Sequence, residues 1–159
     1  MASSERPVVF PSFIDPAWRI GIVYSDYYKE EMDQLLQGAS ITLKDAGIRP
    51  ENITLHRAPG SFEIPLIGAT LVERRKVDAM IGLGIILEGK THHARLLAEA
   101  VTRGIMDIQI RSGIPFAFEI LYVDSLDLVR ERCAPGQNKG TEGAVAVLHS
   151  LAELHALQS

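Results

Sequence analysis

VDAMIGLGIIL, at residues 77–87, is almost continuously apolar. A strand with one solvent-exposed face alternates apolar and polar residues, whereas a strand covered on both faces is apolar along nearly its whole length. We therefore predict that residues 77–87 form a strand of a parallel sheet that is covered by other elements on both faces.

Strand and helix patterns alternate on either side of this stretch. β-Branched, aromatic or alternating apolar residues predict further strands at residues 18–25, 52–58 and 115–123. Apolar residues at helical spacing predict helices at about residues 28–46, 62–76, 92–112 and 140–157. Ser125 is a suitable N-cap for a short helix to about Arg132. The order strand then helix, repeated four times and followed by one more helix, predicts an α/β fold with a four-stranded parallel sheet in a three-layer αβα sandwich.

The length of 159 residues fits one domain. Residues 1–17 are predicted to form an irregular N-terminal arm, and residues 18–159 the single αβα domain. Apolar side chains between Val8 and Ile14 make the arm too hydrophobic for a free tail. We expect the arm to pack on this subunit or on a neighbouring one.

Composition and charge exclude several classes of protein. With 47% hydrophobic and 23% charged residues the chain matches soluble globular proteins, and its net charge of −4 without a basic stripe argues against a nucleic acid partner. The sequence lacks an apolar run long enough to span a membrane, and residues 1–17 lack the apolar core of a secretory signal. We therefore expect a cytoplasmic protein.

Cysteine and glycine patterns narrow the chemistry further. The single cysteine, Cys133, excludes an internal disulfide and a cysteine-rich zinc site, and is interpreted as a small residue at a helix end. The sequence has neither a Gly-x-Gly-x-x-Gly motif after its first predicted strand nor a Walker-type glycine loop. Dinucleotide and nucleoside triphosphate binding therefore lose their main support.

Two short segments are the main candidates for a site. APGSFEIP at residues 58–65 and GKTHH at residues 89–93 each follow a predicted strand and open a predicted helix. Parallel α/β sheets bind ligands at the carboxyl ends of their strands. The first segment offers a hydroxyl, an aromatic ring and a carboxylate, and the second offers a glycine, a hydroxyl and an imidazole.

Several of the candidate side chains also have a structural interpretation. Ser61 suits a helix N-cap and Glu63 the first turn of a helix, or the two grip a polyhydroxylated chain. Tyr27 and Tyr28, after the first predicted strand, are either half-exposed aromatics or rings that stack on a planar heterocycle.

The second segment combines an anion site with a titratable group. Gly89, Lys90 and Thr91 would supply backbone N–H groups, an ammonium and a hydroxyl at a helix start. His93 is either structural or a proton-transfer group, because imidazole titrates near neutral pH. The neighbouring residues His92 and His93 do not predict a metal site, because the side chains of adjacent residues in a helix point in different directions. The remaining histidines are interpreted as structural or surface residues: His56, His92, His149 and His155.

The roles of three residues in the second half of the chain have two alternative interpretations each. Arg132 and Lys139 flank a Pro-Gly break and are interpreted either as phosphate ligands or as solvated helix ends. Phe118 lies within the fourth predicted strand and belongs to the core unless that edge meets another subunit.

Together these positions resemble the lumazine synthases over about residues 18–157. The strongest matches are PGSFEIP at residues 59–65, the pattern Leu83-Gly84-(x)4-Gly89-x-Thr91-x-His93, and NKG at residues 138–140 before a helix of small residues. The order and spacing of all three agree with the family.

The resemblance implies a flavodoxin-like fold and a homopentamer with each active site between two neighbours, and some members form an icosahedral assembly of twelve rings. It implies a transferase of riboflavin biosynthesis that condenses 5-amino-6-(ribitylamino)pyrimidinedione with 3,4-dihydroxy-2-butanone 4-phosphate. An imine forms, phosphate is eliminated, and the ring closes with loss of water. The resemblance implies no metal and no organic cofactor.

The resemblance also implies a role for each candidate residue. His93 would be the proton shuttle, and Ser61, Phe62 and Glu63 would hold the ribityl-pyrimidine substrate. The other candidates would line the pocket or its phosphate-binding part, with Phe118 coming from a neighbouring subunit: Tyr27, Gly89, Lys90, Thr91, Phe118, Arg132 and Lys139.

Several residues depart from the family pattern. Asp26 stands where a cation is usual, Lys90 where a small residue is usual, and Glu119 where a glycine is common. The link from Arg132 to Lys139 is one residue shorter than usual. These departures leave open a paralogue with an altered substrate or without turnover, which binds a flavin or lumazine or forms a shell. A generic flavodoxin-like FMN carrier is a weaker alternative, because the sequence lacks a hydroxyl-rich phosphate loop after the first strand.

Overall fold

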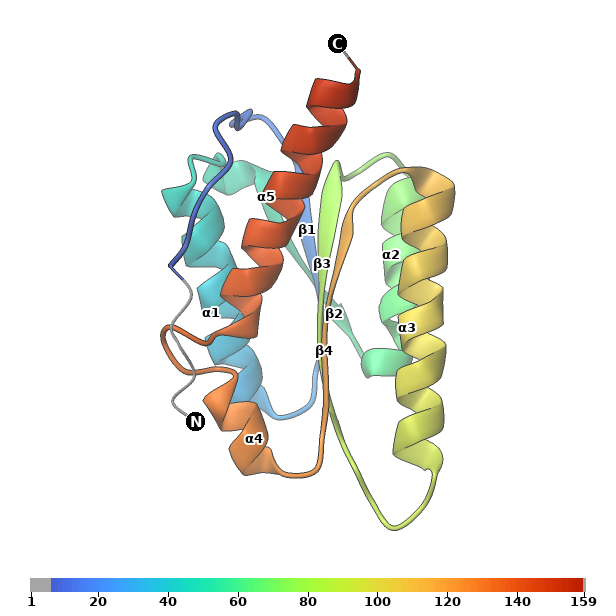
Figure 1. The fold of residues 1–159 in the computed structure, drawn as a ribbon. Coiled ribbons are helices and arrows are strands. Elements are labelled where there is room, and N and C mark those ends of the chain that lie inside the picture. The colour runs from blue at the N-terminus through green and yellow to red at the C-terminus, as the bar shows by residue number, and fades with distance from the viewer. Residues whose placement is uncertain (1–6, 159) are drawn as a thin grey trace.

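The structure, a computed structural model, describes residues 7–158. Within these residues a four-stranded parallel sheet has the strand order β2-β1-β3-β4 (Figure 1). This order matches the first four strands of the flavodoxin-like arrangement. The strands are β1 (Ile20–Ser25), β2 (Ile53–Ala58), β3 (Ala79–Leu87) and β4 (Phe116–Val123).

Helices cover both faces of the sheet, as Figure 1 shows. One face carries α1 (Lys29–Asp45), α4 (Leu126–Glu131) and α5 (Lys139–Leu157). The other carries α2 (Ile64–Glu73) and α3 (His93–Ser112). The predicted three-layer αβα sandwich is confirmed. None of the helices within residues 7–158 is long and apolar enough to cross a membrane.

The two hydrophobic cores meet at β3. Ile81, Leu83 and Ile85 pack in the core beneath α1 and α5, whereas Met80 and Ile86 pack in the core beneath α2 and α3. All of β3 except its last residue is buried, which confirms the prediction of a strand covered on both faces. Each Å² of apolar surface buried in this way contributes about 25 cal/mol, so β3 is a main source of stability.

The strands begin one or two residues later than the sequence pattern predicts. Before β1, the N–H of Arg19 donates to Oδ2 of Asp78 at 2.7 Å, and the guanidinium donates to the same carboxylate. Because a side chain takes this N–H, the ladder between β1 and β3 begins with Ile20 opposite Ala79.

Of the two alternatives for Ser61, the helix N-cap is wrong. Ser61–Glu63 form a short 3-10 helix, η2, before α2, and neither helix has a side-chain cap. Pro65 lies at the start of α2 and lacks an N–H, which removes one of the donors that a cap would satisfy. The predicted cap at Ser125 is confirmed, because its hydroxyl accepts a hydrogen bond from the N–H of Leu128.

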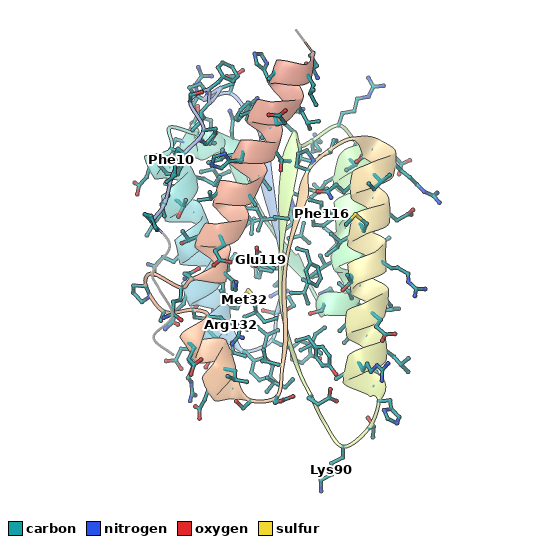
Figure 2. All side chains as sticks on the ribbon, viewed as in Figure 1. Phe10, Met32, Lys90, Phe116, Glu119 and Arg132 are labelled. Atoms are coloured by element: carbon teal, nitrogen blue, oxygen red, sulfur yellow. The ribbon has the colours of Figure 1, made fainter. Side chains whose placement is uncertain are left out.

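The described part of the N-terminal arm packs on its own subunit. Phe10 packs against the core beneath α1 and α5 (Figure 2). A hydrogen bond of 2.7 Å joins His149 Nε2 to the carbonyl oxygen of Val9, and the ring of Phe13 stacks on His155 with centroids 4.2 Å apart. Residues 1–6 of the predicted arm and residue 159 of the predicted domain lie outside the described residues.

Candidate active site

A pocket of about 730 Å³ opens at the carboxyl ends of β1, β2 and β3, beside α3. It therefore brings together candidate residues that lie far apart in the sequence. Its lining comes from the turns after β1 and β2, the end of β3 and the first turns of α3: Tyr27, Tyr28, Gly60, Ser61, Phe62, Glu63, Ile85, Ile86, Leu87, His93, Ala94, Leu96, Leu97 and Ala100.

A carboxylate and an aromatic ring converge over Gly60. A Cβ built at Gly60 would lie 3.4 Å from Glu63 Oε2 and 3.4 Å from Tyr27 Cε2. Phe62 lines the same pocket with 64% of its surface exposed. An acceptor for hydroxyl groups thus lies beside flat apolar surfaces, which suits a ligand with a planar ring and a polar chain.

Two serine hydroxyls are buried near the carboxyl ends of the strands, one at the end of β1 and one in η2. Ser61 is 5% exposed, and its Oγ lies over Gly84 of β3. Ser25 ends β1 opposite Ala58, is fully buried, and its Oγ has no hydrogen-bond partner within residues 7–158. Leaving a buried hydroxyl unpaired costs about 1–3 kcal/mol. Sequence analysis missed Ser25, although a serine that ends an apolar strand two residues before Tyr27 was a usable signal.

Tyr28 has an uncommon backbone conformation at the edge of the pocket. Its φ of 54° and ψ of 60° lie in the left-handed region, which residues other than glycine rarely adopt. Such strain persists when the surroundings over-determine it, and it is frequent at ligand sites. The turn directs the chain from β1 into α1 while Tyr27 and Tyr28 both line the pocket.

His93 is the first residue of α3 and is solvent-exposed. Its backbone N–H donates to Thr91 Oγ1 at 3.4 Å. No residue of the described chain hydrogen-bonds to its imidazole, so both ring nitrogens are free for a ligand in the pocket. The other histidines that were interpreted as structural hold contacts at the arm or on β2, apart from His92, which is exposed beside His93.

The structure does not bring Gly89, Lys90 and Thr91 into the lining of the pocket. Lys90 lies at the outer end of the loop between β3 and α3 and points away from the body of the protein (Figure 2). The N–H of Gly89 donates to Glu88 Oε1 at 3.2 Å, and Glu88 also accepts a hydrogen bond from the hydroxyl of Tyr122. This N–H is therefore already occupied.

Phe118, Arg132 and Lys139 also lie outside this pocket. Phe118 is 42% exposed on β4, the strand at the sheet edge, so the core alternative is wrong for the single chain, and a contact of this edge with another subunit stays a prediction. The guanidinium of Arg132 donates to the carbonyl oxygen of Leu128 at 3.1 Å, and Lys139 pairs with Glu142 at 2.6 Å. In one chain these candidates are separated from His93.

Glu119, next to Phe118 on β4, is an unusual carboxylate that sequence analysis noted only as a departure. Burial beneath α5 raises its pKa to about 7, with Lys139 acting to lower the pKa and Glu142 to raise it. Figure 2 shows Glu119 between β4 and α5. Its position at an inward-facing register of an edge strand was the signal available in the sequence.

The described part of the chain shows neither a group of metal-ligating side chains nor an exposed thiol. Within residues 7–158, no three His, Cys, Asp or Glu side chains are grouped so that they could hold a metal ion. Cys133 is buried behind α4, and burial raises the pKa of its thiol to about 11, with Glu31 adding to the rise. A neutral buried thiol is a poor nucleophile, which agrees with the structural interpretation of Cys133.

Comparison with known proteins gives a consistent result. The family model described as 6,7-dimethyl-8-ribityllumazine synthase matches residues 17–155. A protein of that name from Parabacteroides distasonis is 39% identical over 131 residues, which cover 81% of each chain. Another, from Limosilactobacillus reuteri, is 34% identical over 138 residues, which cover 87% of this chain and 88% of the relative. The chain belongs to the 6,7-dimethyl-8-ribityllumazine synthase family, whose members are transferases of riboflavin biosynthesis.

Proposed function

We propose that the pocket beside α3 is where this enzyme condenses 5-amino-6-(ribitylamino)pyrimidinedione with 3,4-dihydroxy-2-butanone 4-phosphate to give 6,7-dimethyl-8-ribityllumazine, phosphate and water. The single observation that carries the proposal is the convergence of Tyr27, Ser61, Glu63 and His93 on one cavity in a chain of this family. These side chains supply a stacking ring, a hydroxyl, a carboxylate and a titratable imidazole.

Each lining residue has a role that follows from its place. Glu63 accepts hydrogen bonds from the ribityl-pyrimidine, and the hydroxyl of Ser61 donates or accepts one. The ring of the substrate packs on Tyr27 and on the backbone of Phe62. His93, with an unoccupied imidazole, takes and returns protons during imine formation and loss of phosphate, a contribution of about 10²–10⁴-fold in rate. Holding the two substrates in register contributes up to about 7–11 kcal/mol in ideal cases.

The pocket of one chain lacks a cation for the phosphate of the second substrate. None of its lining residues is Lys or Arg. A phosphate carries between one and two negative charges near neutral pH and is bound best by such cations. We infer that a neighbouring subunit completes the site with Phe118, Arg132 and Lys139, and that Gly89, Lys90 and Thr91 border its phosphate-binding part. We also propose that the protein assembles as a homopentamer or a multiple of it and that it is located in the cytoplasm.

Two of the departures from the family pattern, Asp26 and Lys90, lie outside the lining of the pocket. Asp26 forms an ion pair of 3.4 Å with Arg57 of β2, and Lys90 points outward from its loop. Neither obstructs the cavity, so neither favours the alternative of a non-catalytic paralogue that binds riboflavin-like ligands or forms a shell.

Steady-state turnover with both substrates, followed by lumazine absorbance and by phosphate release, tests the proposal. One phosphate per lumazine is expected from the oligomeric protein. A protein that is oligomeric and binds the pyrimidine, but forms no lumazine, would refute the catalytic function and support the binding alternative. A monomer with full turnover would refute the shared site.

A further inference from the structure

We propose that Asn138 is a positioning residue, whose side-chain amide fixes the loop between Arg132 and Lys139 against α1 and so sets the affinity for the butanone phosphate. The inference rests on the proposed function, in which these two cations complete the pocket of a neighbouring subunit. It gives a role to the first residue of the NKG segment at 138–140, of which only Lys139 has one so far.

The side-chain amide of Asn138 joins three separate segments. Its Nδ2 donates to the carbonyl oxygen of Gln34 in α1 at 3.0 Å and to that of Cys133, after α4, at 2.9 Å. Its Oδ1 accepts a hydrogen bond from the N–H of Thr141 at 3.2 Å, so Asn138 is also the N-cap of α5. An amide turned by 180° would lose all three hydrogen bonds, because its donors would face N–H and its acceptor would face carbonyl groups.

Two glycines leave the room that this contact needs. A Cβ built at Gly38 of α1 would lie 2.7 Å from Asn138 Nδ2 and still closer to its Oδ1. A Cβ built at Gly140 of α5 would collide with the carbonyl oxygen of Leu35 in α1. The first turn of α5 therefore meets α1 backbone to backbone, with the amide of Asn138 packed on Gly38. This packing leaves the amide little freedom to move.

The loop that Asn138 ends carries the two cations at its base. It runs from Arg132, at the end of α4, past α1 to the start of α5 (Figures 1 and 2). The N–H of Lys139 donates to the carbonyl oxygen of Arg132 at 2.9 Å, which closes the loop. The hydrogen bond from Asn138 to Cys133 is a second link, directly inside the first. Together the two links fix the separation of the two backbones that carry the cations.

Each cation is also held by its own helix. The guanidinium of Arg132 donates to the carbonyl oxygen of Leu128 at 3.1 Å, which uses one of its five N–H donors. The Nζ of Lys139 lies 2.6 Å from Oε2 of Glu142. A phosphate binds more tightly to cations that are in place before it arrives, since less conformational freedom is then lost on binding. The hydrogen bonds of Asn138 keep the two backbones in place in this way.

The test variant is Asn138→Ser, which keeps an oxygen suited to cap α5 and removes the amide donors. In the assembled protein, the Kd for the butanone phosphate and for inorganic phosphate should rise at least about tenfold, as expected when one hydrogen bond to a charged group is lost. The Kd for the ribityl-pyrimidine should stay as in wild type. KM for the butanone phosphate should rise while kcat is unchanged, because the lost contact serves binding alone. Calorimetry and steady-state kinetics measure these values.

Asn52→Ser is the matched control. The Nδ2 of Asn52 donates to the carbonyl oxygen of Ala17 at 3.1 Å, so this variant also loses a link from an amide to the backbone, but before β2 and outside the loop. It should leave the Kd of both substrates unchanged. Gly38→Ala is a second test variant, which keeps Asn138 and displaces its amide from the side of α1. It should weaken phosphate binding in the same direction as Asn138→Ser.

Amide hydrogen exchange supplies a readout that needs no substrate. The N–H of Lys139, which is bonded to Arg132, should exchange faster in Asn138→Ser and in Gly38→Ala than in wild type. Amides in the middle of α5 should keep their protection, and Asn52→Ser should match the wild type throughout. Unchanged exchange at Lys139 in both test variants would contradict the link across the loop.

The outcomes separate this inference from the proposed function. Normal turnover with an unchanged Kd for phosphate in Asn138→Ser and Gly38→Ala would overturn the positioning role and leave the function intact. A wild-type oligomer without turnover, whose binding of phosphate both variants weaken, would refute the function and leave the positioning role intact. Equal weakening of both substrates, or loss of the oligomer in both variants, would also overturn the positioning role, because Asn138 would then serve the structure as a whole.

Discussion

Gly84 of β3 lies directly beneath the hydroxyl of Ser61: a Cβ built at Gly84 would be 2.6 Å from Ser61 Oγ and 3.0 Å from Ile120 Cδ1. Ser61, which lines the pocket, therefore packs on a strand position that has no room for a side chain. The Gly84→Ala variant should push Ser61 out of place and lose about 1–3 kcal/mol of stability through overpacking. Urea unfolding and the Kd of the ribityl-pyrimidine would measure both effects. Gly89→Ala is the stability control, because open space surrounds that position. Equal losses in the two variants would refute the contact.

Ser25→Ala should stabilise the protein by about 1 kcal/mol, because it removes a buried hydroxyl that has no partner in the described chain. Urea unfolding measures the change. Ser150→Ala on the exposed face of α5 is the control and should stay within about 0.5 kcal/mol of wild type. Destabilisation by Ser25→Ala would show that the hydroxyl has a partner, such as a bound water.

His93→Ala should lower kcat by about 10²–10⁴-fold while binding of the pyrimidine stays nearly unchanged, because imidazole transfers protons without supplying much binding. Steady-state kinetics and calorimetry separate these effects. His92→Ala is the matched control, since that residue is also exposed and does not line the pocket. An unchanged kcat in His93→Ala would remove its assigned role.

Glu63→Ala should mainly weaken the binding of the ribityl-pyrimidine substrate. A hydrogen bond to a charged group contributes about 1.5–3 kcal/mol, so Kd should rise roughly 10- to 100-fold. Calorimetric titration measures this Kd. Glu73→Ala, at the far end of α2 and outside the pocket, should leave Kd as in wild type. Equal affinity in Glu63→Ala would contradict the contact.

The pair of Arg19 and Asp78 predicts a pH dependence of stability. Burial alone would raise the pKa of Asp78, but hydrogen bonds and the charge of Arg19 outweigh it, so the pKa lies below its ordinary value. A carboxyl group with a lowered folded pKa stabilises above its unfolded pKa of about 3.9, and this stability is lost as pH falls through the folded value. Arg19→Met should cost about 0.5–1 kcal/mol at pH 7, because the pair is half-exposed and screened.

Urea unfolding of Arg19→Met between pH 2 and 7 checks this prediction. The difference from wild type should shrink as pH falls, because protonation of Asp78 removes the ion pair. Arg111→Met, which removes a more exposed pair with Asp107, is the control and should show a smaller difference at every pH. A difference that does not vary with pH would assign the effect of Arg19 to packing instead.

Local patterns in the sequence determined the layers of this protein. The apolar run at residues 77–87 requires cover on both faces of a strand, and the alternation of strand and helix patterns around it requires parallel strands with helical crossovers. The same local rules placed the segments at 58–65 and 89–93 after strands. They did not decide between the two roles of Ser61, since a cap depends on where the hydroxyl points once the strand beneath it is present.

Only the tertiary structure decided which candidate side chains share a cavity. The strand order β2-β1-β3-β4 brings Tyr27, Glu63 and His93 into one cavity, and it leaves Phe118 of β4 at the other edge of the sheet. Local periodicity does not encode strand order, because it records which face of an element is apolar and not which elements are neighbours. The raised pKa of Glu119 is decided at the same level, since it follows from burial beneath a helix that begins twenty residues later in the chain.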